Sequence, residues 1–362
     1  MTQTFANPAT SDVWQPGSTL NVRCVAVIPE THDVMSFWFQ ADNPMLFHFK
    51  PGQFVTLNLT INGKPVQRCY TIVTSPSRPY CFAIAVKQVP DGLVSNWLHD
   101  NLSVGDTLDI QGPAGIFTSI DYPAEKVLLL SGGVGITPVM SMARWWADTM
   151  ANVDVVFIHS ARTPADILFL EELNRLDAVM PNFKLVVICE KIEPGQSWYG
   201  YRGFLHNNIL DATTPDLLER EIFCCGPGPY MAAVQQMLQE IGFDMSRYHE
   251  ESFITTPEEN PEDAATYIEA TIDESELITV EFAASSKTAE ILPGETIHQA
   301  AGKVGLHMPR ACGMGLCGTC KVLKKSGDVT MNHSGGITDE DIAEGYILSC
   351  CSVPQGNVVV DF

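Results

Sequence analysis

The sequence predicts a multidomain chain with an antiparallel β-barrel, an α/β domain built on a parallel sheet, and a small α+β domain. Three observations lead to this prediction. Short strand patterns follow one another through residues 18–122, strand and helix patterns alternate through 123–254, and spaced cysteines occupy the C-terminal part. Antiparallel barrels, parallel sheets and compact cysteine-bearing domains are typical of these three patterns.

The first domain, 18–122, is predicted from runs of β-branched and aromatic residues bounded by Pro, Gly, Asn and Asp. The strands are expected at 21–30, 34–41, 53–61, 68–75, 82–89 and 107–112, with one helix at 95–102. Short strands at this spacing favour an antiparallel barrel.

The second domain, 123–254, alternates between the two kinds of element. Strands are expected at 126–132, 153–160, 183–190 and 221–226, and helices at 138–150, 165–176 and 230–242. Such alternation favours a parallel sheet with helices on both faces.

An acidic linker, 255–270, precedes the last domain. Its sequence TTPEENPEDAAT combines prolines and acidic residues with little apolar content. The last domain, 271–362, should contain two strands within 277–292 and a short helix at 297–305.

Composition restricts the classes of function. The chain has 362 residues and a net charge of −22, which opposes nucleic-acid binding. No stretch approaches the roughly 18 apolar residues of a membrane span, and no signal peptide is evident. The 11 cysteines lack the pattern of a small disulfide scaffold, so we expect a soluble cytoplasmic protein in a reducing compartment.

From residue 257 to the end the chain has 17 acidic and 6 basic residues. This excess suits docking to a basic patch on a redox partner. A generally acidic, solubilising surface is the alternative, because acidic residues also occur throughout the rest of the chain.

Four cysteines near the C-terminus have the plant-type spacing of a 2Fe–2S cluster. Cys312, Cys317 and Cys320 form a C-x4-C-x2-C loop, and Cys350 ends the apolar run GYILSC. Glycines in the loop let backbone N–H groups turn towards the sulfurs. A zinc site would need a second C-x2-C pair or nearby histidines. Adjacent strand residues face opposite sides, so only one of Cys350 and Cys351 should point inward, and the spacing leaves open which one.

A glycine-rich turn, GGVGITPVMS at 132–141, follows the strand at 126–132. Backbone amides and the helix dipole make such a turn a seat for phosphate, although a tight turn without a ligand is the alternative. The spacing departs from GxGxxG, so an ordinary dehydrogenase is not indicated. CCGPGPYM ends the last strand and places Cys225 at the same sheet edge, unless it is simply a buried core cysteine.

Two segments of the first domain suit a flavin. Arg68 and Tyr70 in RCYT share one strand face, which pairs a cation for phosphate with a ring for stacking. GLVSNWL places Gly92 and Ser95 at a helix start, a second phosphate seat. Taken alone, each feature is as typical of a purely structural role as of flavin binding.

RCYT, GLVS, GGVGITP and CGPGPYM, in this order and followed by the four cysteines, resemble the ferredoxin–NADP reductase superfamily with a C-terminal plant-type ferredoxin domain. Within it the chain is similar to reductase components of two-component Rieske-type oxygenases, especially those for glycine betaine or carnitine demethylation. VSNWLHDNL, GITPVMSMARW and MSRYHEESF carry this second similarity. The resemblance implies a ferredoxin-like (β-grasp) fold for the last domain.

The resemblance also implies roles for individual residues. The flavin would be held by Arg68, Cys69, Tyr70, Thr71, Val86, Gly92, Val94 and Ser95. The pyridine nucleotide would meet Gly132, Gly133, Gly135, Thr137, Pro138, Ser160, Arg162, Cys225, Gly226 and Pro227. The catalytic group would be Thr71 near flavin N5, Cys225 beside the nicotinamide, Glu251, and Phe253 shielding the ring. The cluster ligands would be Cys312, Cys317, Cys320 and Cys350, since the family pattern GYxLxC ends at Cys350.

The resemblance favours FAD over FMN, because the related FMN group has a more basic turn in place of GLVS. Ser160 ends the strand at 153–160 and Arg162 follows it, and both would meet a 2′-phosphate. No acidic residue ends that strand to bind a ribose diol. Reductases of such oxygenases commonly use NADH, so the resemblance nevertheless favours NADH over NADPH.

The predicted function is transfer of electrons from NADH through FAD and the 2Fe–2S cluster to a Rieske-type terminal oxygenase on another polypeptide. The same electron-transfer chain serving a ring-hydroxylating oxygenase, a fatty-acid desaturase or a hybrid-cluster protein is the alternative. A redox sensor whose cofactors report rather than turn over is a third hypothesis. The acceptor is decided by the complementarity between its surface and that of this chain, and one sequence does not show that complementarity.

Overall fold

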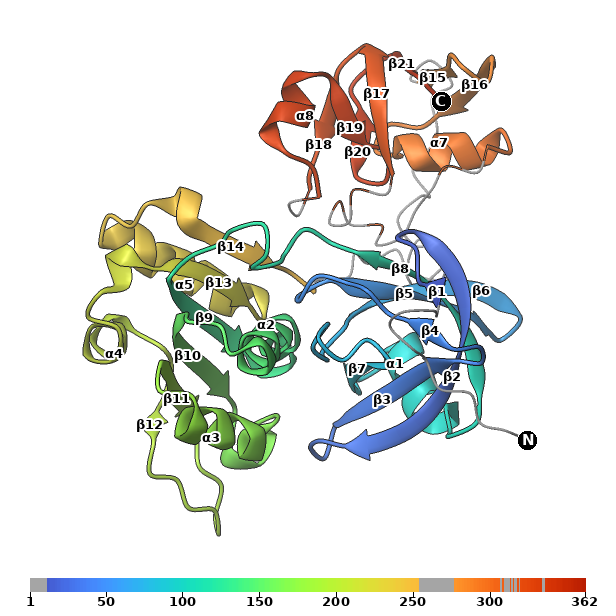
Figure 1. The fold of residues 1–362 in the computed structure, drawn as a ribbon. Coiled ribbons are helices and arrows are strands. Elements are labelled where there is room, and N and C mark those ends of the chain that lie inside the picture. Colours follow the sequence, from blue (N-terminus) through green and yellow to red (C-terminus); the bar gives the residue numbers. More distant parts are fainter. Residues whose placement is uncertain are drawn as a thin grey trace. The chain divides into compact units, whose positions relative to one another are not determined.

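The computed structural model describes residues 12–253, 277–306, 308, 313, 315, 318, 320–333 and 336–362 (Figure 1). The chain divides into two compact units, Met1–Phe253 and Ile254–Phe362. The predicted linker at 255–270 lies outside the described residues. The predicted fold class is confirmed: the first unit holds an antiparallel sheet and a parallel sheet, and the second holds a mixed sheet.

The antiparallel sheet has the order β6-β5-β8-β2-β3-β7. Its strands are β2 (Ser18–Pro29), β3 (Val34–Ala41), β5 (Phe54–Ile61), β6 (Lys64–Thr71), β7 (Phe82–Lys87) and β8 (Thr107–Ala114), beside a small pair of β1 (Asp12–Val13) and β4 (Met45–Leu46). A bridge between Ile72 and Ile84 joins the two outer strands and closes the barrel. Each predicted strand of this domain is present.

Local sequence explains the hairpin turn between β5 and β6 and the packing of the helix that follows β7. Asn62 and Gly63 both have positive φ, 53° and 74°, as a two-residue hairpin turn between β5 and β6 requires. Helix α1 (Leu93–Asn101) follows β7 and packs Val94 and Leu98 into the barrel core.

The parallel sheet has the order β12-β11-β10-β9-β13-β14. Its strands are β9 (Lys126–Gly132), β10 (Asp154–Ala161), β11 (Phe183–Cys189), β12 (Tyr201–Arg202), β13 (Glu221–Cys225) and β14 (Tyr248–Glu251). Helices α2 (Ile136–Thr149), α3 (Leu170–Val179), α4 (Asn207–Thr213) and α5 (Gly228–Glu240) connect them, with short 3-10 turns η1 (Gly133–Gly135), η2 (Pro164–Asp166), η3 (Leu217–Glu219) and η4 (Met245–Arg247).

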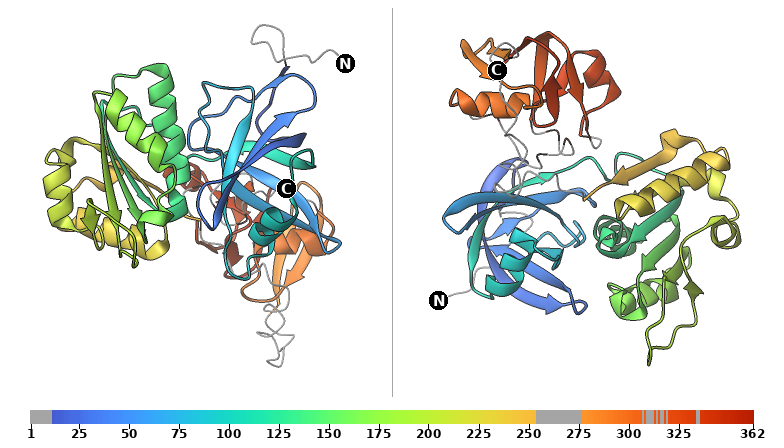
Figure 2. Two further views of the ribbon diagram at one scale, coloured as in Figure 1. Left: turned by 90° about the horizontal axis from the view of Figure 1, so that it is seen from below. Right: turned by 180° about the vertical axis from the view of Figure 1, so that it is seen from behind.

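The helices cover both faces of the parallel sheet (Figure 2). Leu129 and Phe157 face α2 and α3, whereas Leu130 and Ile158 face α4 and α5. Successive strand residues point to opposite faces, so a strand buried on both sides must be apolar at every position. This is why KVLLLSG has no polar alternation.

Helix α2 also packs against the barrel. Val73, Ala83 and Phe117 of the barrel belong to the same core as α2. Ser141 Oγ donates a hydrogen bond to the Thr74 carbonyl (2.7 Å), and Arg144 Nη1 donates one to the Val73 carbonyl (2.6 Å). The two sheets of the first unit therefore share one buried interface.

The second unit has the sheet order β16-β15-β21-β17-β19 and a separate pair of β18 and β20. The strands are β15 (Ile278–Phe282), β16 (Lys287–Ile291), β17 (Lys321–Ser326), β18 (Val329–Met331), β19 (Tyr346–Leu348), β20 (Ser352–Pro354) and β21 (Val358–Val360). Helix α7 (Ile297–Lys303) begins with a Thr296–Gln299 capping box and buries Ile297, Ala300 and Ala301 against the sheet, and α8 (Asp339–Ala343) precedes β19.

Several elements differ from the sequence prediction. Helix α3 begins at Leu170 rather than at residue 165, because Pro164–Asp166 form a 3-10 turn with a Thr163 capping box. The short elements α4, β12 and β14 of the parallel-sheet domain were not predicted. No helix among the described residues is long and apolar enough to cross a membrane.

Candidate functional site

The predicted flavin residues lie on β6 and at the start of α1. Arg68 and Tyr70 alternate with Cys69 and Thr71 along β6, as the strand period requires. Cys69 Sγ contacts the Thr56 hydroxyl on β5 (3.4 Å), and Thr71 is buried. Arg68 and Tyr70 therefore share the opposite strand face from Cys69, which is the arrangement that the sequence predicted.

The start of α1 is held close to β7. Gly92 is its N-cap, and a Cβ there would collide with Ser95 Oγ and a Val89 methyl group, so a larger residue would displace both side chains. His99 Nε2 is 2.9 Å from the Val86 carbonyl and fixes the helix against the strand. The first amides of a helix have no intrahelical partner, which suits this end to phosphate oxygens.

The turn after β9 is packed too closely for side chains. A Cβ at Gly135 would collide with the Cys225 carbonyl, and one at Gly132 would lie 3.0 Å from Pro227. Gly133 adopts φ +53° with open space around it. The glycine-rich turn and the end of β13 thus touch, as predicted for a dinucleotide seat at the carboxyl edge of the sheet.

Four other residues predicted to meet the nucleotide have structural roles of their own. Thr137 is buried and donates from Oγ1 to the Val134 carbonyl (3.1 Å). Pro138 lies in the first turn of α2, where the missing N–H costs no helix hydrogen bond. Pro227 is the N-cap of α5, and a Cβ at Gly226 would lie 2.8 Å from the Tyr230 ring.

A row of buried polar residues crosses the carboxyl edge of the parallel sheet. His159, Ser131, Cys225 and Glu251 are consecutive register partners on β10, β9, β13 and β14. Register partners in a parallel sheet point to the same face. Sequence reasoning found Cys225 and Glu251 through the family motifs but missed His159 and Ser131, because only strand register brings them together.

His159 is uncharged at neutral pH. It is fully buried, and its Nδ1 lies 2.9 Å from Ser131 Oγ, while Nε2 has no hydrogen-bond partner among the described residues. Burial lowers the pKa of His159 to about 4. The imidazole is therefore a neutral polar group beside Ser131.

Glu251 is also neutral at pH 7. Burial raises the pKa of its carboxyl group to about 8, and the nearby Thr71 hydroxyl partly opposes this shift. Among the described residues neither carboxyl oxygen has a hydrogen bond of normal geometry. Burial likewise raises the pKa of the neighbouring Cys225 thiol well above its ordinary value. Thr71 from the barrel, Cys225 and Glu251 therefore come together, and Phe253, 37% exposed, follows two residues after Glu251.

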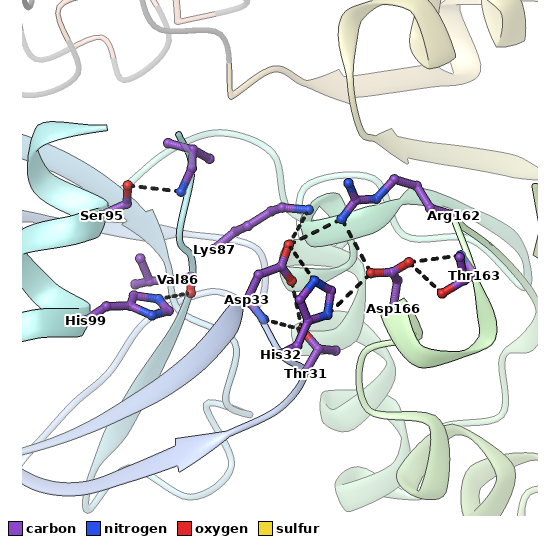
Figure 3. A network of polar contacts seen from close by, with 11 residues as sticks. Thr31, His32, Asp33, Val86, Lys87, Ser95, His99, Arg162, Thr163 and Asp166 are labelled. Atoms are coloured by element: carbon purple, nitrogen blue, oxygen red, sulfur yellow. Dashed lines mark hydrogen bonds and ion pairs between the residues drawn. The ribbon is translucent and has the colours of Figure 1, made fainter. Parts of the chain in front are cut away.

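Arg162 forms ion pairs that the sequence did not predict. Its Nη2 lies 3.3 Å from Asp33 Oδ2 and 3.4 Å from Asp166 Oδ1, and Lys87 Nζ lies 3.1 Å from the same Asp33 oxygen. Figure 3 shows the two carboxylates pointing towards Arg162, one from the β2–β3 turn and one from η2. Ser160, its predicted companion, makes no ion pair or hydrogen bond with this network: its Oγ is buried near the Tyr230 hydroxyl, without a hydrogen bond of normal geometry among the described residues.

His32, Asp33 and Asp166 bring possible metal-binding atoms within 4.8 Å of one another. The positive charge beside these carboxylates already comes from Lys87 and Arg162. We therefore interpret the cluster as an ion-pair network.

The loop predicted to bind the cluster, residues 312–320, is described in part. Cys312 and Cys317 lie outside the described residues, whereas Cys320 and Cys350 are both buried. Gly313, Gly315 and Gly318 have φ of 71°, 67° and 70°, in the region that favours glycine. The Gly315 N–H points to the Cys350 sulfur. Paired thiols with an inward-turned amide suit a 2Fe–2S cluster.

The sequence analysis placed Cys350 on a strand, but the structure places it in a turn. Ser349, Cys350 and Cys351 form a turn between β19 and β20, closed by a hydrogen bond from the Cys351 N–H to the Leu348 carbonyl (3.1 Å). Strand alternation therefore does not separate the two thiols.

Three family matches agree with this geometry. Residues 22–119 match the family described as an oxidoreductase FAD-binding domain, and residues 129–236 match the oxidoreductase NAD-binding domain. Residues 280–355 match the 2Fe-2S iron-sulfur cluster binding domain. The fold and the site thus define an oxidoreductase that combines FAD-, NAD- and 2Fe–2S-binding domains, and the predicted cofactors are confirmed.

The chain belongs to the family of ferredoxin reductase-type proteins that includes the glycine betaine monooxygenase reductase subunits. It is 59% identical to that subunit of Pseudomonas aeruginosa and 58% identical to that of Chromohalobacter salexigens, over the whole of each chain. It is also 43% identical to a stachydrine N-demethylase reductase subunit of Rhizobium meliloti, covering 94% of this chain and 96% of that one. The predicted family and enzyme class are confirmed.

Solved structures share the fold. A phthalate dioxygenase reductase aligns with a TM-score of 0.61 and 23% identity, covering 95% of this chain and 98% of the other. A ferredoxin reductase in carbazole 1,9a-dioxygenase aligns with a TM-score of 0.58 and 28% identity, covering 66% of this chain and 70% of the other.

Gly135→Ala should destabilise the nucleotide-binding unit, because its methyl group would push α2 away from the Cys225 carbonyl. We expect a loss of about 1–3 kcal/mol in stability, measured by thermal unfolding, with weaker NADH binding. Gly133→Asn is the stability control, since its position is open and Asn tolerates positive φ. An unchanged unfolding midpoint for Gly135→Ala would contradict the close packing.

Glu251→Gln should remove a pH dependence of stability. The folded-state pKa of about 8 exceeds the ordinary value of 4.5, so the contribution of the protonated carboxyl group is complete below pH 4.5 and lost as pH rises through 8. Between about pH 5 and pH 9 the unmodified protein should lose roughly 2–5 kcal/mol relative to the variant. Thermal unfolding of both proteins across this range measures the difference, and parallel curves would show that the pKa is not raised.

Proposed function

We propose that this chain is the reductase component of a two-component Rieske-type oxygenase that demethylates glycine betaine or a similar quaternary ammonium compound. The observation that carries the proposal is the 59% identity over the whole chain with a glycine betaine monooxygenase reductase subunit. The buried site on the first unit and the cysteine pair on the second supply the residues that such a reductase needs.

The proposed roles follow from the contacts. When bound, FAD would accept a hydride from NADH, and the 2Fe–2S cluster would pass electrons on singly. Arg68 and Tyr70 would hold and orient the flavin, and the start of α1 at Gly92 and Ser95 would bind its phosphates. The turn at Gly132–Gly135 would bind the nucleotide phosphates.

The catalytic group on the first unit would keep the reacting rings close and the pocket uncharged. Cys225 and Glu251 are neutral at pH 7, because burial raises the pKa of both groups. Thr71 lies beside Glu251, so its hydroxyl and the protonated carboxyl group can hold a proton near the flavin. Phe253 is exposed enough to cover a ring.

NADH is the proposed nucleotide. The sequence suggested Arg162 as a receptor for a 2′-phosphate, but its guanidinium is paired with Asp33 and Asp166. A 2′-phosphate approaching Arg162 would also approach these two carboxylates, and like charges repel.

The acceptor is proposed to be a terminal oxygenase in the cytoplasm. Free thiols and an iron–sulfur cluster are typical of a reducing compartment. The excess of acidic residues after residue 257 would steer the chain to a basic patch on the oxygenase. A stachydrine demethylase system is the second candidate, because the 43% identity to its reductase subunit covers nearly the whole chain.

Asp33→Asn should improve the use of NADPH. Loss of one negative charge beside Arg162 should raise kcat/KM for NADPH about tenfold, while kcat/KM for NADH changes less than about twofold. Asp42→Asn, which removes an exposed ion pair with Arg23, is the matched control. Equal kcat/KM changes for the two nucleotides would contradict a selectivity role.

Reconstituted turnover tests the function as a whole. The chain, NADH, oxygen and a candidate Rieske oxygenase from the same host are combined, and formaldehyde release is measured with glycine betaine, carnitine or stachydrine as substrate. We expect release from glycine betaine that requires both proteins. Brisk NADH-dependent reduction of cytochrome c without formaldehyde would leave the electron-transfer chain intact and reject the demethylase assignment.

A further inference from the structure

Two adjacent cysteines lie at the fourth ligand position of the cluster site. Cys350 and Cys351 belong to the same turn between β19 and β20 rather than to an extended strand. In a strand their side chains would point to opposite faces. In this turn both thiols remain near the cluster-binding loop.

The contacts of Cys350 identify the side of the turn that faces the loop. Its thiol is within hydrogen-bonding reach of the Cys320 thiol, the Cys351 thiol and the Gly315 N–H. Cys350 thus lies between one proposed ligand, Cys320, and the neighbouring cysteine.

Cys351 also touches the loop directly. A Cβ built on Gly315 would lie 2.6 Å from Cys351 Sγ, so this sulfur packs against the Gly315 backbone. Its sulfur donates a long hydrogen bond to the Leu348 carbonyl, 3.6 Å, and lies within reach of the Cys350 thiol. Cys351 is partly exposed and weakly held, and a side-chain rotation could redirect its sulfur.

We propose that Cys351 is a reserve ligand, able to replace Cys350 as the fourth thiolate of the 2Fe–2S cluster. The inference rests on the proposed ligand set of Cys312, Cys317, Cys320 and Cys350. In the exchange, the bond between iron and the Cys350 sulfur would break and a bond to the Cys351 sulfur would form. The Cys351 thiol releases its proton, and the displaced Cys350 thiolate takes one up. With Cys350 in place, Cys351 remains an unligated thiol.

The test compares four variants of the full chain after anaerobic cluster reconstitution: Cys350→Ala, Cys351→Ala, the double variant, and Cys320→Ala. Iron content, visible circular dichroism and the EPR spectrum of the reduced protein measure the cluster. Alkylation with iodoacetamide followed by mass spectrometry shows which thiols are free.

Cys351→Ala should keep the spectrum of the unmodified protein. Cys350→Ala should keep most of its iron, with Cys351 changing from alkylated to protected. The double variant should fall roughly tenfold in iron content, as loss of a ligand predicts. The proposal would be overturned if Cys350→Ala contained as little iron as the double variant and Cys351 was still alkylated.

Cys350→Ser covers the case in which Cys350→Ala does not fold, because serine has nearly the same shape. The proposal is supported if Cys350→Ser shows the spectrum of a cluster bound by four thiolates and Cys350→Ser/Cys351→Ala does not. It is rejected if the two variants have identical spectra. Cys320→Ala tests the proposed ligand set separately from the role of Cys351. If it keeps the cluster, the proposed ligand set is wrong, whatever Cys351 does.

Discussion

The proposed flavin and nicotinamide sites depend on the docking of α2 against the segment that follows β6. Ser141 and Arg144 of α2 hold the carbonyls of Thr74 and Val73, a few residues after Thr71. The same helix begins beside Gly135, whose backbone touches the Cys225 carbonyl. One helix thus fixes the end of a barrel strand and the end of a sheet strand together. Without that shared interface, Thr71 and Glu251 would belong to separate bodies and their side chains would not meet.

This interface also explains the protonation states at the site. Packing two sheets around α2 removes water from the row that runs from His159 to Glu251. Desolvation disfavours charge of either sign, so it raises the pKa of Glu251 and lowers that of His159. The result is a polar row that carries no net charge at neutral pH. Its groups offer hydrogen bonds at the edge of the sheet where the nucleotide is proposed to bind, without the repulsion that an ionised carboxylate would cause.

Sequence patterns predicted most of the fold, because long apolar strands such as β9 and amphipathic helices such as α5 are specified locally. The four residues of β14 were missed, since so short a strand forms only through pairing with β13. The family motifs indicated Thr71, Cys225 and Glu251, but not the bond between His159 and Ser131 or the pairing of Arg162 with Asp33. Those contacts join residues 28 and 129 positions apart and depend on tertiary structure. The placement of Cys350 and Cys351 was wrong for the opposite reason, because the local rule of strand alternation was applied to two residues that lie in a turn.

Local charge balance reconciles an acidic chain with an anionic nucleotide. The net charge of −22 would repel NADH if it acted over the whole molecule. At physiological ionic strength, however, charges are screened beyond about 8 Å, so only the groups near the site matter. There Glu251 is protonated, and Asp33 and Asp166 are neutralised by Lys87 and Arg162. Backbone amides of the glycine-rich turn add partial positive charge. The surface can therefore remain acidic, because Glu251, Asp33 and Asp166 are either protonated or paired.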